Sequence, residues 1–391
     1  MPLTATGHQD EVIRPFLWGL LPDNDRTLDQ YGRLFGVSPR NPVALLSHIG
    51  ADCAGAVQFA PPERADDLEG TPLVAPTVEW LAETEIAQEL RIVREQGIPG
   101  TNSRTVGQFS LAGAQPKIAL LEEGGRWGRP SGRTPTNRIL KPPTGEFRAL
   151  AENEHFCLEL AGHLGLGSVR SRVVRFLDEV AIVVERFDRI KRGRSYLRVH
   201  QEDVCQALGI MPSRKYENEG GPGIKDIVTL FRDASLKPQE DVERFIRATA
   251  LNWVIAATDA HAKNYALLHS TGGGVRLAPF YDILSYLPYA EPALHRVRLA
   301  MKVGKTYPVR RINRSSWETL AKANGMTSKY VLDNIEAVLA QLPEAAETVA
   351  QASIDEGLDS SVIQRLTDRI LDRTKVCTAV LTHARPISPA A

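Results

Sequence analysis

The sequence is poor in the features that mark secreted, membrane-spanning and zinc-binding proteins. Only four of its 391 residues are cysteines, Cys53, Cys157, Cys205 and Cys377, and no two of them form a C-x-x-C pair. This spacing argues against a zinc site or a redox dithiol and predicts four unpaired structural thiols. No segment approaches the roughly 20 apolar residues of a membrane span, and the start, MPLTATGHQDEVIRP, does not resemble a signal peptide. We expect a cytoplasmic chain without membrane contact.

The chain also lacks a net charge. Lysine plus arginine and aspartate plus glutamate both total 47, so no overall field draws in nucleic acid or an anionic membrane. Two basic segments stand out, DRIKRGR at 188–194 and RRINR at 310–314. We interpret both as solvated loops, with a contact to nucleic acid or a partner protein as the alternative.

Length and composition predict more than one globular unit. A single core stops growing near about 250–300 residues, whereas this chain has 391 residues, of which 43% are hydrophobic. Residues 60–79 are rich in proline, glycine and acidic residues without an apolar period, which is typical of a linker. We predict a small N-terminal subdomain with a linker helix at 1–100, a small lobe at 101–190 and a mainly helical lobe at 191–391.

In the middle of the chain, apolar residues recur both with the spacing of a helix and with the spacing of a strand. PTVEWLAETEIAQELRIV has helical spacing, with Thr77 as a candidate cap. Strands are expected in IALLEE and NRILKPP around the turn GGRWG, followed by a helix in ALAENEHFCLELAGHLGL and two strands in SRVVRFLDEVAIVVERF. Beyond residue 200 the pattern is helical, notably in DVERFIRATALNWVIAAT, with one hairpin in NYALLHSTGGGVRLAPF. The expected fold class is α+β.

Three oxygen-bearing side chains are the strongest candidates for chemistry. Asp259 follows an apolar helix, and Asn264 lies five residues further on. This D-x-x-x-x-N spacing occurs in kinase catalytic loops, where the aspartate accepts a hydroxyl proton and the asparagine holds magnesium. A hairpin then leads to APFYDIL, whose Asp282 is expected to return beside Asn264 as a second oxygen ligand. The alternative is that Asp259 and Asn264 only cap the helix and the next strand.

Further candidates each have an ordinary alternative. Gly113 has small neighbours that let backbone N–H groups cradle phosphates, but both common phosphate-loop patterns are absent, so the segment is otherwise a plain turn. Lys141 is placed as a phosphate-pairing lysine or as a solvated strand end. Glu154 would pair with Lys141 or is a common helix N-terminal acid. His261 and Lys263 line the phosphate path or are polar loop residues.

Two more sites concern the nucleotide and its control. The backbone at 185–187, in VVERFD, would form a hinge that binds adenine, although a core strand has the same pattern. Ser110 lies three residues before Gly113 and is a candidate phosphorylation site. About two added negative charges would repel a phosphate-binding loop and inhibit the protein. A surface hydroxyl is the alternative.

Eight segments in order resemble one family, the HipA-type serine/threonine protein kinases, which are toxins of bacterial toxin–antitoxin pairs. They are SLAGAQPK, ILKPP, ENEHFCLELAGHLGL, VVERFDR, HQEDVCQALG, KYENEGGPGI, ATDAHAKN and APFYDILS, from about 104 to 290. The resemblance implies a bilobal protein-kinase-like fold that uses ATP and Mg²⁺ to phosphorylate a protein serine or threonine.

The resemblance also implies roles for individual residues. Asp259 would be the general base, Asn264 and Asp282 would bind the metal, and Ser110 would be an autophosphorylated serine whose modification turns the kinase off. The residues implied for ATP binding are Ala112, Gly113, Ala114, Gln115, Pro116, Lys117, Lys141, Glu185, Arg186, Phe187, His261, Ala262, Lys263, Asn264, Tyr281, Asp282, Ile283 and Leu284.

The implied partners are proteins. One is a small, HipB-like helix-turn-helix antitoxin, and the chain would contact DNA only through it. The other is the target, an aminoacyl-tRNA synthetase, which the resemblance identifies as glutamyl-tRNA synthetase. LLPDND and LLSHIGADCAGAV resemble the later part of the family's N-terminal subdomain, but the strands that normally precede it are missing. We expect either a misplaced start codon or a separate small protein that supplies those strands.

Two other functions fit the same residues. Small-molecule phosphotransferases share the D-x-H-x-x-N pattern, and a catalytically silent module would keep the fold and act as a co-repressor with its antitoxin.

Overall fold

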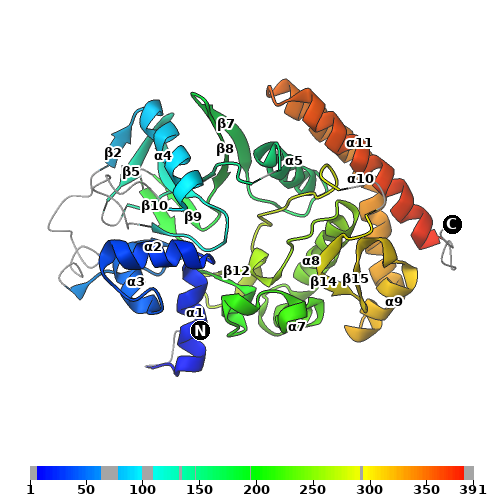
Figure 1. Ribbon diagram of the computed structural model, residues 1–391. Helices are drawn as coiled ribbons and strands as arrows, with labels where there is room; N and C mark the ends of the chain where they lie inside the picture. The colour runs from blue at the N-terminus through cyan, green and yellow to red at the C-terminus, as the bar shows by residue number, and fades with distance from the viewer. Residues whose placement is uncertain are drawn as a thin grey trace. The chain divides into compact units, whose positions relative to one another are not determined.

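The structure, a computed structural model, describes residues 7–62, 78–98, 109–131, 134–145, 147–193, 195–290 and 294–382. The chain divides into two compact units (elements labelled in Figure 1). Unit 1 is drawn from Met1–Ala151, Ser171–Ser213 and Ala266–Gly273, and unit 2 from Glu152–Arg170, Arg214–Tyr265 and Gly274–Ala391. The three-part division at 1–100, 101–190 and 191–391 stays a prediction.

Unit 1 contains short helices and most of the strands. Its helices are α1 (Asp10–Leu20), α2 (Asp25–Phe35), α3 (Pro42–Ile49), α4 (Glu83–Gln96) and α6 (Val204–Ala207). Its strands are β1 (Asp52–Cys53), β2 (Val78–Leu81), β3 (Phe109–Ser110), β4 (Ile118–Glu123), β5 (Arg126–Pro130), β6 (Arg138–Lys141), β7 (Ser171–Phe176), β8 (Glu179–Glu185), β9 (Arg189–Arg192), β10 (Ser195–Arg198), β11 (Gln201–Asp203) and β12 (Ala266–His269).

The largest sheet of unit 1 is antiparallel, with the strand order β2-β5-β4-β6-β8-β7. Alternate side chains of a strand point to the same face, and Ile118 and Leu120 of β4 bury against Ile86 and Leu90 of α4. The predicted strands IALLEE, NRILKPP and SRVVRFLDEVAIVVERF therefore form one sheet, with α4 packed on it.

One predicted helix begins later than expected. Residues 78–81 form β2, which pairs with β5 so that Trp80 lies opposite Gly128, and the Arg126 guanidinium stacks 4.0 Å from the Trp80 ring. Helix α4 starts only at Glu83, where Glu85 accepts a hydrogen bond from the backbone N–H of Ala82. The helical spacing of 78–81 was misleading because pairing with a neighbouring strand outweighs local periodicity. The cap candidate Thr77 lies outside the described residues.

A second core in unit 1 joins α1, α2 and α3. Phe16, Leu20, Leu45 and Ile49 are buried together there. Strand β1 follows α3 and pairs in parallel with β3, so that Cys53 lies opposite Ser110. The N-terminal helices are thereby tied to the segment that leads into the predicted phosphate loop.

Unit 2 is mainly helical. Its helices are α5 (Leu150–His163, from Glu152 onward), α7 (Ile224–Ala234), α8 (Pro238–Val254), α9 (Arg314–Ala323), α10 (Ser328–Asp355) and α11 (Ser360–Thr382), with 3-10 turns at Glu217–Glu219, Ala262–Asn264 and Val309–Arg311. Its strands are β13 (Val275–Leu277), β14 (Arg298–Val303) and β15 (Thr306–Pro308).

Helix α8 is the buried centre of unit 2. Its Phe245, Leu251 and Trp253 have no exposed surface, and the Trp253 ring meets that of Trp317 edge-on at 5.6 Å. Helix α10 packs against α8 and along α11, the long helix near the C-terminus in Figure 1. Within the described part of the chain, no helix combines the length and apolarity needed to cross a membrane.

The prediction of four unpaired structural thiols is confirmed, because all four cysteines are free and buried. Burial raises the pKa of Cys53, Cys157 and Cys377 to about 12. A thiol reacts as its thiolate, so these side chains act as small apolar core residues.

Candidate active site

The loop after α8 folds back on itself through Asn264. The helix ends at Val254, and Ala256 adopts a left-handed backbone conformation with φ 52°. Asn264 donates a side-chain N–H to the backbone carbonyl of Asp259 at 2.8 Å, while the Asp259 side chain is 65% exposed. An amide that donates through its nitrogen keeps its oxygen as an acceptor, so Asn264 still offers an oxygen ligand.

Two aromatic rings hold the Asp259 carboxylate. Tyr216 donates its hydroxyl to Asp259 Oδ1 at 2.6 Å, and the Tyr216 ring meets the buried His261 ring edge-on at 4.9 Å. His261 Nε2 lies 3.9 Å from the same Oδ1. Both contacts converge on Oδ1, so the second oxygen of Asp259 is the better placed of the two to accept a proton.

The backbone at Asp282 is strained and fastened to this loop. Asp282 has φ 53°, a left-handed conformation that is uncommon outside glycine. Its neighbour Tyr281 donates a hydroxyl to the carbonyl of Lys263 at 2.7 Å. Asp282 is the sequence neighbour of Tyr281, and Asn264 is that of Lys263. The bond therefore brings together the two segments that the sequence predicts to converge.

Asn153 of α5 fixes the segment after Asp282. Its amide donates to the Ser285 carbonyl at 2.8 Å and accepts from the Ser285 N–H at 3.0 Å. The Ser285 hydroxyl in turn donates to the Ile255 carbonyl at the end of α8. Asn153 and Ser285 have no exposed surface, so these bonds are shielded from water and define the path of the backbone.

Aromatic packing anchors both ends of the loop. The ring of Tyr265, directly after Asn264, meets those of Phe245 and Phe280 edge-on, at 5.0 and 6.0 Å. The Tyr265 hydroxyl accepts a hydrogen bond from Asn252 of α8. A polar loop thus stands on a rigid apolar base, which suits precise placement of reacting groups.

The predicted phosphate loop of unit 1 is a glycine-dependent turn. Gly113 has φ 105°, and a Cβ atom there would lie 2.6 Å from Lys117 Nζ. Lys117 donates to the Ala112 carbonyl at 2.6 Å, and the Gly113 carbonyl accepts from the N–H of Asp23 at 3.3 Å. The backbone of this loop therefore curls around the Lys117 ammonium. The loop comprises Ala112, Gly113, Ala114, Gln115, Pro116 and Lys117.

Ser110 and Lys141 are buried, which corrects the alternatives of a surface hydroxyl and a solvated strand end. Ser110 is 1% exposed and donates to the Leu20 carbonyl at 2.7 Å. Lys141 is 6% exposed at the end of β6. Glu154 is also buried, but it belongs to unit 2 and Lys141 to unit 1, so their pairing stays a prediction. His261 and Lys263 are likewise buried, so both alternatives for them, the phosphate path and a polar loop, stay open.

The segment after β8 contains a cluster that sequence reasoning missed. Asp52 and Asp188 are surrounded by Arg186, Arg189 and Arg198, and we call these five residues the buried ion cluster. The side chains of Arg186 and Arg189 are 1% and 0% exposed. The interpretation of 188–194 as a solvated loop was therefore wrong for its first two residues, because the chain supplies opposite charges to neutralise them.

The buried ion cluster also limits the role of the predicted hinge. The Arg186 guanidinium bonds to Asp52, Asp188, Thr136 and the Cys53 carbonyl. Its side chain is therefore committed to the fold, and an adenine contact at 185–187 would have to use the backbone. The role of the predicted hinge in binding adenine stays a prediction.

The fold and this loop together define a class of protein. A small antiparallel sheet together with a helical unit, whose buried central helix ends in an aspartate–asparagine loop, is the α+β arrangement of protein-kinase-like proteins.

Comparison with known proteins gives the family. The HipA-like C-terminal domain model matches residues 109–346, and the HipA N-terminal domain model matches residues 1–60. This chain belongs to the HipA family. "Putative kinase Y4mE" of Sinorhizobium fredii is 34% identical over 381 residues, covering 96% of this chain and 88% of that relative. The serine/threonine-protein kinase toxin HipA of Shewanella oneidensis is 29% identical over 400 residues, covering 99% of this chain and 88% of the toxin.

A solved structure supports the same fold. The Shewanella oneidensis HipA, from a complex with HipB and operator DNA, superposes with a TM-score of 0.82 at 25% identity, covering 99% of this chain and 90% of that one. The predicted family and the protein-kinase-like α+β fold are confirmed.

Tyr216 is the site residue that sequence reasoning missed. It lies in KYENEGGPGI, a segment recognised from its resemblance but given no role. Its contact with Asp259 spans 43 residues of sequence, so no local period reveals it. The motif itself was the available signal.

Proposed function

We propose that this chain is an ATP- and Mg²⁺-dependent serine/threonine protein kinase, the toxin of a toxin–antitoxin pair. The observation that carries the proposal is the closed loop in which Asn264 bonds to the Asp259 carbonyl and Tyr216 bonds to the Asp259 carboxylate. Membership of the HipA family supports it, because a relative over nearly the whole chain is a serine/threonine-protein kinase toxin.

Asp259 would act as the general base. The substrate hydroxyl would pass its proton to the carboxylate oxygen that Tyr216 does not contact, as the hydroxyl oxygen bonds to the γ-phosphorus of ATP. The bond from that phosphorus to the bridging oxygen breaks, and ADP leaves. General base catalysis of this kind contributes about 10²- to 10⁴-fold, and positioning supplies much of the rest.

Asn264 and Asp282 fit a magnesium site by their chemistry. The Asn264 amide nitrogen is used by the Asp259 carbonyl, which leaves an amide oxygen, and Asp282 offers a carboxylate. Mg²⁺ prefers such hard oxygen ligands together with water and phosphate. When bound, the ion would neutralise phosphate charge, while the strained Asp282 backbone and the Tyr281–Lys263 bond hold the ligands in place.

The test is phosphate transfer from labelled ATP by the purified full chain. Asp259→Asn and Asp282→Asn should each abolish transfer while leaving the circular dichroism spectrum and melting curve unchanged. Asp233→Asn on the exposed face of α7 is the matched control and should keep full activity. Equal activity in the wild type and both site variants would refute the assignments.

From the resemblance, we propose that the protein substrate is an aminoacyl-tRNA synthetase. Glutamyl-tRNA synthetase is the first candidate to test. Incubation of the kinase with labelled ATP and a lysate should place the label in a protein band that purified glutamyl-tRNA synthetase reproduces. Label in a metabolite fraction alone would instead identify a small-molecule phosphotransferase.

Ser110 is proposed as an autophosphorylation site that switches the kinase off. Its hydroxyl is buried and bonded to the Leu20 carbonyl, so modification requires this bond to break and the strand that carries Ser110, β3, to move. A phosphate would then prevent the strand from returning, because its charge cannot be buried against a carbonyl oxygen. Phosphopeptide mass spectrometry of the wild type beside Asp259→Asn tests this; phosphate on Ser110 in both proteins would exclude self-modification.

The proposed regulator is a helix-turn-helix antitoxin of the HipB type. The support is that the Shewanella oneidensis structure is a complex of HipA, HipB and operator DNA, and that the neutral charge of this chain gives no independent reason to bind DNA. The complex of this chain with the antitoxin, purified together, should slow the migration of operator DNA in a gel. This chain alone should leave the migration of the DNA unchanged. A shift caused by this chain alone would contradict DNA binding through the antitoxin.

A further inference from the structure

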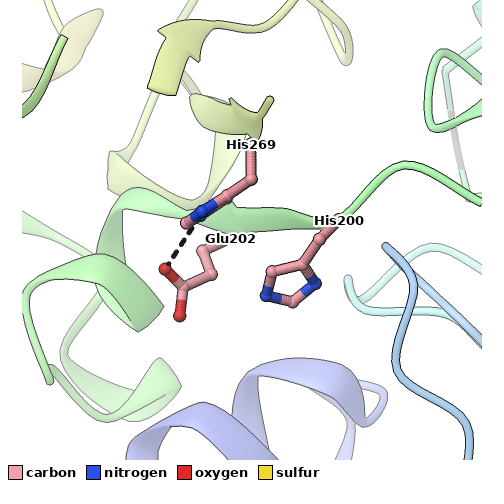
Figure 2. Close-up of side chains that lie close together, drawn as sticks. All are labelled: His200, Glu202 and His269. Carbon is pink, nitrogen blue, oxygen red and sulfur yellow. Dashed lines mark hydrogen bonds and ion pairs between the residues drawn. The ribbon is translucent and has the colours of Figure 1, made fainter. Parts of the chain in front are cut away.

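Three side chains of metal-ligating types, none of them assigned to phosphate transfer, meet in unit 1. They are His200, Glu202 and His269, whose ligand atoms all lie within 4.8 Å of one another. Figure 2 shows the Glu202 carboxylate beside both imidazole rings, with the His269 Nε2 to Glu202 Oε2 contact of 3.2 Å dashed. The ring centroids of the two histidines are 4.9 Å apart.

The strand pairing explains why these three converge. Strands β11 and β12 are antiparallel, with Gln201 opposite Leu268, and the His269 N–H donates to the His200 carbonyl at 2.9 Å. His200 and His269 therefore form a directly opposed pair. Glu202 lies two residues after His200, on the same face of the ribbon, because side chains alternate along a strand.

The three side chains differ in their exposure and their neighbours. Glu202 is nearly buried, with 5% of its side chain exposed, while 23% of the His269 side chain is exposed. The Phe16 ring lies 6.2 Å from the His200 ring, and Gly55 approaches His200 Nδ1 so closely that a Cβ atom would lie 3.0 Å from it. One side of the cluster is packed against Phe16 and Gly55, and the His269 side is partly exposed.

The spacing suits zinc. Two ligands each about 2 Å from a tetrahedral zinc ion lie roughly 3.3 Å apart. His269 and Glu202 already have that separation at 3.2 Å. No ligand pair is more than 4.8 Å apart, so the widest would need to close by at most about 1.5 Å. Two histidines and one carboxylate, with water as the fourth ligand, is a common zinc-binding set.

We propose that His200, Glu202 and His269 form a binding site for a divalent transition metal of the zinc class, with water as the fourth ligand. The ion would cross-link β11 to β12, whose Glu202 and His269 are 67 residues apart in sequence. Imidazole ligands favour zinc, nickel or copper over magnesium, so this site is chemically distinct from the proposed Mg²⁺ site.

The experiment uses the untagged full chain, stripped with EDTA and desalted, with zinc chloride as the probe and no nucleotide. Calorimetric titration should show one zinc bound per chain, and the thermal midpoint should rise with zinc concentration, because a ligand that binds the folded state stabilises it. Cobalt chloride should give the visible absorption of a low-symmetry histidine site, and magnesium chloride should give neither signal.

Variants of the ligands distinguish a zinc-binding site from a simple ion pair between His269 and Glu202. Glu202→Gln, which preserves side-chain shape, and His269→Ala should each weaken zinc binding at least tenfold, with circular dichroism verifying that they fold. His163→Ala, at an exposed histidine of α5, is the control and should bind like the wild type. No zinc binding by the wild type, or equal binding in all variants, would mean that the His269–Glu202 contact is only an ion pair. Neither result depends on phosphate transfer, so the kinase proposal is tested separately.

Discussion

Replacing Asp52 by Asn removes one negative charge from the buried ion cluster. The Asp52 carboxylate accepts from Arg186 at 3.1 Å, from Arg189 at 2.8 Å and from Arg198 at 3.0 Å. In the variant, three guanidinium groups would face Asp188 alone, leaving two uncompensated positive charges. Removing one partner of a buried pair costs about 3–5 kcal/mol, so we expect a loss of that size in the free energy of unfolding at pH 7.

The effect should depend on pH in a defined direction. Burial alone would raise the pKa of Asp52, but Arg186, Arg189 and Arg198 outweigh it and hold the pKa well below its usual range. Stability from a depressed carboxyl pKa is present above the unfolded value, about 3.9, and is lost as the pH falls toward the folded value. The gap between the wild type and Asp52→Asn should therefore be constant from pH 7 to 5 and narrow below about pH 4.

Urea unfolding followed by circular dichroism at pH 7, 5 and 3.5 measures both quantities. The matched control is Asp178→Asn, which weakens an ion pair with Arg91 at a side chain that is 71% exposed. Its unfolding midpoint should match the wild type within error. A loss below about 1 kcal/mol for Asp52→Asn, or a gap that widens in acid, would refute the reasoning.

Three further changes test the candidate site. Asn153→Ala leaves two backbone groups of Ser285 buried without their partner, which should cost about 2–6 kcal/mol in urea unfolding; an unchanged midpoint would contradict it. Tyr216→Phe removes the 2.6 Å bond to the proposed base and should lower kcat about 10- to 100-fold with KM for ATP unchanged; equal kcat would show that the bond has no catalytic part. Gly113→Ala puts a Cβ atom 2.6 Å from Lys117 Nζ at φ 105° and should weaken ATP binding about tenfold by calorimetry; unchanged affinity would argue against phosphate binding by this loop.

Local patterns were enough for most of the secondary structure. Strands β4, β6, β7 and β8 and helices α5 and α8 form where the two periods predicted them. The failures share one cause. Residues 78–81 became a strand and Arg189 became buried because distant segments, around 128 and 52, supply the partners. Single-sequence periodicity carries no information about such partners.

The sequence suggests the residues of the candidate site, whereas the contacts that support them are not visible in it. The spacing of Asp259, Asn264 and Asp282 is visible in the sequence, because their order along the chain matches the kinase pattern. The bonds from Tyr216 and Asn153 join positions 43 and 132 residues apart. The cluster of His200, Glu202 and His269 was missed for the same reason, since His269 lies beside His200 only through the register of β11 and β12.

The interleaving of the two units has a consequence for synthesis on the ribosome. Strand β12 of unit 1 is encoded after the Asp259–Asn264 loop of unit 2, and its pairing with β11 cannot form until residues 266–269 emerge. Translation from Glu152 to Gly273 takes roughly 6–25 s at bacterial rates. A message cut short before β12 would therefore yield a chain that lacks part of both units, so no product that ends there contains a complete unit.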